Sequence, residues 1–113
     1  MSVFSWLGDH FTNRGRALAL YRRGMKKAKK HDHEGAIDDY TAVINTPDVS
    51  PDIKAMAHYN RALVHRATKN ETTAIEDLNV ILTMKVAMVN VNVKTMARQE
   101  LIRIERRSAR GST

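Results

Sequence analysis

Cysteine is absent from the 113 residues of this sequence. Its absence excludes a disulfide framework, a thiolate zinc site and a cysteine nucleophile, and it suits a reducing compartment. The apolar runs are far shorter than the ~18 residues of a membrane-spanning helix. The sequence also lacks a glycine-rich phosphate loop, a dinucleotide fingerprint and the glycine-flanked serine of a nucleophile elbow. We therefore expect a cytoplasmic protein that is not an enzyme and binds no cofactor.

Acidic residues are in the minority, with 12 Asp and Glu against 19 Lys and Arg. The net charge of +7 favours acidic partners, whether proteins, nucleic acids or lipid head groups. A chain of this length usually forms one domain with one modest core. His31 and His33 flank Asp32, but neighbouring residues in a turn rarely converge on one ion. We expect no metal site.

One stretch of the sequence occurs twice. Residues 36–44 read AIDDYTAVI, and residues 74–82, which lie 38 positions later, read AIEDLNVIL. The same offset relates residues 19–24 (ALYRRG) to residues 57–62 (AHYNRA). A period of this size is typical of repeat proteins whose unit is a supersecondary element. Each unit contains two helical patterns, so we interpret it as a helical hairpin.

Local signals predict where these helices begin. Asp32 and Ser50 suit the N-cap position, Pro51 suits the first helical position, and Asn70 suits a cap or a left-handed residue. The valine and asparagine alternation at 84–93 hints at a strand, but it has no partner strand, so we expect a loop or frayed helix there. The chain is expected to be all-α, with helices at residues 2–12, 16–30, 34–45, 51–68 and 71–83 and a last helix after Asn92.

These helices predict three parts of the chain. An N-terminal amphipathic helix occupies residues 1–15 and ends at a break at 13–15. Two repeats follow in residues 16–84, divided into 16–50 and 51–84, and a C-terminal capping helix with a basic tail occupies residues 91–110. Two repeats alone leave apolar faces at both ends. We expect the flanking helices to cover these faces, with self-association as the other solution.

The repeated pattern resembles the tetratricopeptide repeat (TPR) over residues 17–84. The small residues that let the two helices of a TPR hairpin approach closely correspond to Gly24 with Ala36 and to Ala62 with Ala74. The resemblance implies helical hairpins stacked in a right-handed superhelix. It covers both copies of the unit, and the copies agree with each other as well as with the family.

A common subtype of the family carries an arginine and an aspartate at two further positions. In this sequence Arg23 with Asp39, and Arg61 with Asp77, match them. All four lie at equivalent repeat positions, which argues for a structural role. We expect each pair to form an ion pair that ties the two helices of its hairpin together.

Other positions depart from the family pattern. His31 and Lys69 stand where the turn glycine is usual, so the turns are expected to differ. One subgroup clamps the terminal carboxylate of a partner. Asn60 matches one clamp position, and Lys94 with Arg98 match two more if the 38-residue offset continues into the last helix. Tyr21 and Met25 do not match the remaining two.

By the same resemblance, the first helix of each repeat lines a concave groove that holds a partner segment. Residues three, four and seven apart share one helix face, and Tyr, Met and Arg are enriched at protein interfaces. An apolar floor with basic edges predicts a partner segment that mixes hydrophobic and acidic residues, as for a scaffold or adaptor. The candidate partner-binding residues are Leu18, Tyr21, Arg22, Met25, Lys29, Met56, Tyr59, Asn60, Leu63 and Arg66.

Three alternatives remain open at this point. The first helix could fill the groove itself. Its aromatic face at residues 3–11, which includes Phe4, Trp6 and Phe11, could instead dock on a membrane surface or another subunit. The basic residues of 16–30 and of the C-terminal tail could also follow the phosphates of a nucleic acid.

Overall fold

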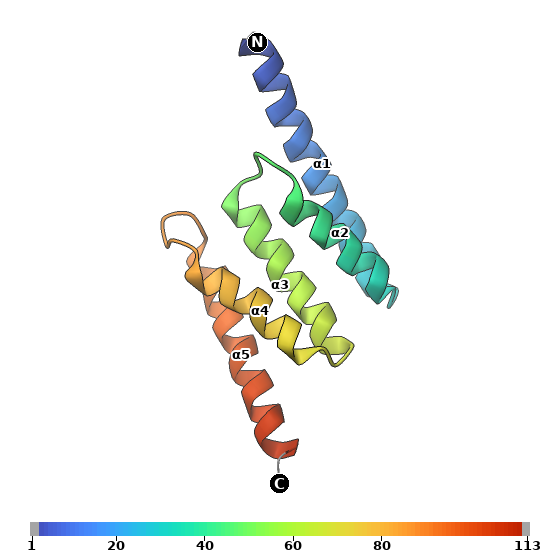
Figure 1. Cartoon of the computed structure of the whole chain (residues 1–113), viewed down its shortest axis with the longest axis vertical. Coiled ribbons are helices and arrows are strands. Elements are labelled where there is room, and N and C mark those ends of the chain that lie inside the picture. The colour runs from blue at the N-terminus through green and yellow to red at the C-terminus, as the bar shows by residue number, and fades with distance from the viewer. Residues whose placement is uncertain (1–2, 112–113) are drawn as a thin grey trace.

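The computed structural model of the chain describes residues 3–111, with side chains described from Thr12 onward. Within this range all regular elements are helices, so the expected all-α fold is confirmed (Figure 1). The five helices are α1 (Val3–Lys29), α2 (His33–Asn45), α3 (Pro51–Ala67), α4 (Glu71–Thr83) and α5 (Val91–Gly111).

Helix α1 is uninterrupted, so the expected break at residues 13–15 is wrong. Gly15 is exposed, and a Cβ placed on it would meet no neighbouring atom. A glycine inside a helix costs only about 1 kcal/mol relative to alanine, and the arginines, alanines and leucines that follow propagate a helix well. The helix expected in residues 1–15 is therefore the first half of α1 and not a separate element.

Capping side chains begin two of the helices where the sequence indicates. Asp32 accepts a hydrogen bond from the backbone N–H of Gly35 at 3.0 Å, which satisfies one free donor of α2. Ser50 does the same for Ile53 of α3 at 3.4 Å, ahead of Pro51. Asn70 occupies the N-cap of α4 without a side-chain capping bond.

The turns within the two hairpins share one backbone conformation. His31 and Lys69 have φ values of 62° and 66°, the left-handed region in which glycine is the usual residue. In the first turn the Asp32 N–H donates to the Lys27 carbonyl at 2.9 Å, and the equivalent bond in the second turn is 2.7 Å long. Both turns therefore keep a glycine-type geometry although neither contains glycine there.

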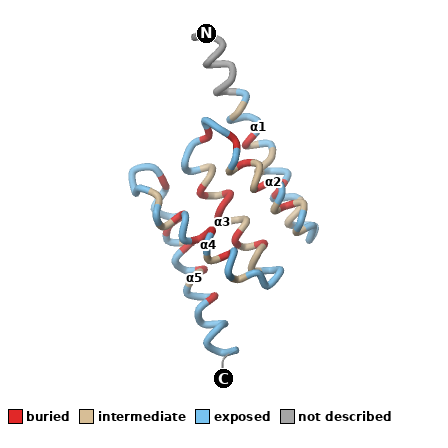
Figure 2. The backbone as a smooth tube through the Cα atoms, in the orientation of Figure 1, coloured by how far each residue is buried: buried red, intermediate tan, exposed pale blue. Residues whose placement is uncertain are grey.

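Among the described side chains, the buried apolar residues form two clusters and not the single core expected from chain length. One cluster, around Tyr40 and Val43, joins α1 and α2 to α3, and the other, around Leu78 and Ile81, joins α3 and α4 to α5. The helices follow one another in a row, which gives an elongated molecule of 63 × 32 × 18 Å (Figure 2). Helix α3 contributes to both clusters, because it packs against the first hairpin as well as against α4 and α5.

Residues 84–90 form the loop expected before the last helix, and α5 begins at Val91, slightly earlier than expected. Val89 is buried in the second cluster, and the Asn90 N–H donates to Asp52 of α3 at 2.8 Å. These contacts hold the loop against α3. Helix α5 then packs on α4 and α3, so it covers the end of the second hairpin.

Candidate functional site

An apolar hollow lies between α1 and the start of α3. It has a volume of about 180 Å³ and is lined by Leu18, Tyr21, Asp52, Ile53 and Met56. The two helices reach this position because α1 and α3 both pack on α2 and also touch each other. Two of the candidate positions on α1 and one on α3 thus meet at a single depression. We call it the α1–α3 hollow.

A hydrogen bond joins the two helices beside this hollow. The side-chain amide of Asn60 donates to the Tyr21 hydroxyl at 2.7 Å and to the Met56 carbonyl at 3.1 Å. Burial raises the pKa of Tyr21, and the bond from Asn60 offsets only part of that rise. The Tyr21 hydroxyl is therefore neutral at physiological pH, and both donors of Asn60 are engaged within the chain.

The remaining candidates on α1 are exposed. Arg22, Met25 and Lys29 continue along the same helix face as Leu18 and Tyr21. Met25 is one of the few large apolar side chains with more than a third of its surface exposed, at 37%. This face offers apolar contact flanked by positive charge.

The second half of α3 is occupied differently. Tyr59 and Leu63 pack in the second apolar cluster together with residues of α5, and Arg66 donates to Glu100 of α5 at 2.8 Å. Of the positions that the sequence assigned to a partner, α5 therefore already binds one, Arg66, and shares an apolar cluster with two others. The candidate face divides into an open part on α1 and the start of α3, and a covered part under α5.

The N-terminal half of α1 does not fold back over the open part. Because residues 3–29 form one helix, the first residues continue along its axis and project beyond the rest of the molecule (Figure 1). The alternative in which a separate first helix fills the groove is thereby removed. The aromatic side chains at residues 3–11, on which the alternative of membrane docking depends, lie outside the described side chains.

The two expected ion pairs are present in the structure. Asp39 is buried and accepts two hydrogen bonds from Arg23, from Nε at 2.9 Å and from Nη2 at 2.7 Å. Lys27 adds a second cation, 3.2 Å from the same carboxylate. The bonds from Arg23 hold the pKa of Asp39 below its ordinary value, against the opposing effect of burial. The pair ties α1 to α2.

The equivalent carboxylate in the second repeat, Asp77, also pairs with an arginine but has a different second partner. Arg61 donates to it from Nε at 2.9 Å and from Nη2 at 2.6 Å, and also donates to Thr41 of α2 at 3.0 Å. His58 lies on its other side, with Nδ1 at 2.9 Å. Burial by itself raises the pKa of Asp77, but the bonds from His58 and Arg61 outweigh it and leave the pKa below its ordinary value. Arg61 thus connects three helices.

The other polar candidates from the sequence have structural partners. Lys94 is buried, and its ammonium donates to the Leu82 carbonyl at 3.3 Å and to the Met84 carbonyl, so it caps the end of α4. Because the Asn60 amide on α3 is also engaged, Arg98 is the one matched clamp residue for which no side-chain hydrogen bond occurs within the described part of the chain. The rings of His31 and His33 lie 6.0 Å apart, and no group of three potential metal ligands occurs among the described side chains.

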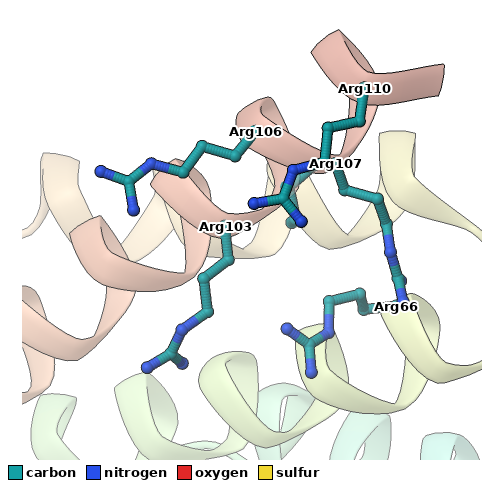
Figure 3. A pocket seen from close by; sticks show the side chains of 6 residues that line it. Arg66, Arg103, Arg106, Arg107 and Arg110 are labelled. Atoms are coloured by element: carbon teal, nitrogen blue, oxygen red, sulfur yellow. The ribbon is translucent and has the colours of Figure 1, made fainter.

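A second hollow, not expected from the sequence, lies at the other end of α3. Its volume is about 320 Å³, and apart from Ile104 its lining is entirely arginine. The arginines, shown in Figure 3, are Arg66, Arg103, Arg106, Arg107 and Arg110. We call it the arginine hollow.

One buried carboxylate organises part of this hollow. Glu100 accepts hydrogen bonds from Arg66 of α3, at 2.8 Å, and from Arg103 of α5. The spacing of 103, 106, 107 and 110 places four arginines on one face of α5, and this signal is visible in the sequence. Their convergence with Arg66 depends on how α5 packs against α3, and the local sequence pattern does not predict this packing.

Comparison of the chain with protein-family models, with curated proteins and with solved structures finds no match. Among the described residues, no helix is both long and apolar enough to cross a membrane.

Proposed function

We propose that this chain is a non-catalytic, TPR-like interaction module that holds a segment of a partner protein along the open face of α1 and α3. The observation that carries the proposal is the α1–α3 hollow, whose apolar walls come from both helices. An apolar depression with a few placed polar groups is the usual form of a recognition site. In this role the chain acts as a scaffold or adaptor.

The chemistry of the hollow defines the partner segment. Leu18, Ile53 and Met56 can bury one aliphatic or aromatic side chain of the partner. Arg22 and Lys29, further along α1, favour acidic residues beside that anchor. Asp52 at the opposite edge disfavours acidic residues there, so the segment has a hydrophobic anchor and an acidic flank that points toward the C-terminal end of α1.

A display library of random peptides, selected on the purified chain at physiological salt, tests this proposal. Enriched peptides are expected to carry a hydrophobic anchor with acidic residues on one side only. Leu18 is half-buried and lies outside both apolar clusters, so Leu18→Asp is expected to leave the fold intact. The substitution should weaken binding about tenfold or more, which corresponds to ~1.4 kcal/mol.

Charge-neutral variants separate a defined site from general attraction. Arg22→Gln/Lys29→Gln removes two charges from the proposed face. Arg16→Gln/Lys30→Gln removes two exposed charges outside this face, one on α1 and one in the turn that follows it. The first pair should weaken peptide binding and its salt dependence, and the second should change little. The proposal would be refuted if the selected peptides lacked a hydrophobic anchor, or if both double variants lost the same amount of peptide affinity. It would also be refuted if the chain associated with itself through this face and excluded the peptides.

A further inference from the structure

We propose that the arginine hollow binds a compact polyphosphate anion, that is, a ligand carrying two or more adjoining phosphate groups. The wall of the hollow consists almost entirely of arginine. Five guanidinium groups converge on one depression, and none of its lining residues is acidic within the described part of the chain. Like charges brought together in this way repel one another, and an anion seated among them removes the repulsion.

The cations in this wall are guanidinium groups and not ammonium groups. Guanidinium groups present a planar fork of N–H donors that binds phosphate oxygens in pairs, whereas an ammonium acts as a point charge. Lysines are frequent on α1, but all five cations around this hollow are arginines. The donor set therefore matches phosphate better than a diffuse acidic surface.

The arginine hollow extends along α5. Arg103 and Arg110 lie seven residues apart on α5, which is about 10 Å along the helix axis, and Arg66 faces them from α3. A single phosphate also has too few oxygen atoms to accept hydrogen bonds from all five guanidinium groups. A volume of about 320 Å³ leaves room for adjoining phosphate groups.

Part of the arginine hollow is held in place by hydrogen bonds within the chain. Glu100 holds Arg66 and Arg103 in place from its buried position on α5. Arg106 and Arg107 are exposed and have no ion pair among residues 12–111. Two arginines thus form a fixed edge, and at least two more can turn toward a ligand without losing an ion pair.

A nucleic acid is the less favoured ligand. Proteins that hold single strands combine basic grooves with aromatic side chains on which bases stack, and no aromatic residue lines this hollow. The site is also separate from the proposed partner face, because Ile53 and Arg66 lie about 20 Å apart along α3. The two proposals can therefore fail independently.

Isothermal titration calorimetry of the full chain in metal-free buffer at constant ionic strength tests the inference. The probes are sodium triphosphate, orthophosphate and a single-stranded RNA dodecamer without terminal phosphates. Triphosphate should bind about tenfold or more tightly than orthophosphate. A nucleoside triphosphate as fourth probe identifies the source of the phosphates, since equal affinity indicates a free chain and tighter binding indicates a nucleotide.

Paired variants test whether binding occurs at this hollow. Arg106→Gln/Arg107→Gln should weaken triphosphate binding about tenfold or more, and Arg106→Lys/Arg107→Lys should fall between it and the unchanged chain because charge is kept and the fork is lost. Arg16→Gln/Lys30→Gln lowers the net charge equally and should change affinity less than about twofold. Circular dichroism checks that each variant is folded.

Three outcomes would overturn the inference. Equal weakening in the Arg106/Arg107 and Arg16/Lys30 variants would indicate diffuse attraction by the whole molecule. Binding of the RNA dodecamer without binding of triphosphate would assign the surface to nucleic acid. Absence of any heat of binding for triphosphate at low ionic strength would show that the arginines hold no phosphate ligand.

Discussion

The two buried aspartates provide a matched test of how burial of the partners sets the strength of an ion pair. Asp39 and Asp77 occupy equivalent repeat positions and are both almost fully buried. Their partners differ, because the Arg23 side chain is 60% exposed whereas the Arg61 and His58 side chains are 20% and 10% exposed. Loss of the carboxylate therefore leaves a largely solvated arginine in the first repeat and a mostly covered arginine in the second.

Substitution of each aspartate by asparagine keeps the shape and removes the charge. Asp77→Asn leaves Arg61 buried without its counter-ion, and breaking a buried ion pair costs about 3–5 kcal/mol. We expect about 3 kcal/mol, since part of the Arg61 guanidinium reaches solvent and Thr41 still accepts one bond. Asp39→Asn loses charge-assisted hydrogen bonds to solvated partners, for which we expect about 1–2 kcal/mol.

Urea denaturation followed by far-UV circular dichroism measures both free energies of unfolding. A domain of this size has a total stability of roughly 6–17 kcal/mol, so both variants should remain folded. The exposed neighbours provide the controls, because Asp38→Asn and Glu76→Gln should change stability by less than about 0.5 kcal/mol. Equal losses for Asp39→Asn and Asp77→Asn would refute the reasoning, because burial of the partners would then have no effect.

The pH dependence gives an independent reading of the same pair. The pKa of Asp77 is lowered in the folded state from its ordinary value of 3.8. As the pH falls, the unfolded chain binds the proton first, so the stabilisation is present above about pH 4 and is lost as the pH falls through the lower folded-state pKa. In Asp77→Asn the free energy of unfolding should fall less steeply below about pH 4 than in the unchanged chain.

Three further changes test the packing and the turns. Gly24→Ala should lower the free energy of unfolding by about 1 kcal/mol in urea denaturation, since a Cβ there meets Tyr40 Cε1 at 2.8 Å and the overpacking outweighs the gain in helix propensity; a more stable variant would contradict this contact. His31→Gly and Lys69→Gly should each stabilise by about 0.5–1 kcal/mol, because both positions have φ near 60°, and a lower midpoint in either would argue against the left-handed turn. Burial lowers the pKa of His65, whose Nδ1 has no hydrogen-bond partner among the described residues. Arg61 also lowers this pKa, while Asp77 and Glu76 raise it. The unfolded chain therefore binds the proton first, and the free energy of unfolding should fall as the pH drops below about 6.5. The stability of His65→Leu should change less between pH 7 and 5, and an unchanged profile would show that His65 is not the titrating group.

Local chemistry determined where two of the helices begin. Asp32, Ser50 and Pro51 act within a few residues of themselves, and the structure places α2 and α3 accordingly. The two copies of the repeated stretch also place Arg23 beside Asp39 and Arg61 beside Asp77, because a shared offset carries both partners of each pair. The break at Gly15 was predicted wrongly, since a glycine weakens a helix without ending it when the residues on both sides continue the helix.

Tertiary packing decided which of the candidate positions remain open. Helix α5 covers Tyr59 and Leu63 but leaves Leu18 beside an open hollow, and the sequence contains no local signal for the angle at which α5 crosses α3. The same packing brings Arg66 to the arginines of α5. The sequence by itself therefore determined the helices, which depend on neighbouring residues, and the two Arg–Asp ion pairs, whose partners lie 16 residues apart within one repeated unit. Only the tertiary structure decided the two hollows, because each is formed by side chains from helices that meet through long-range contacts.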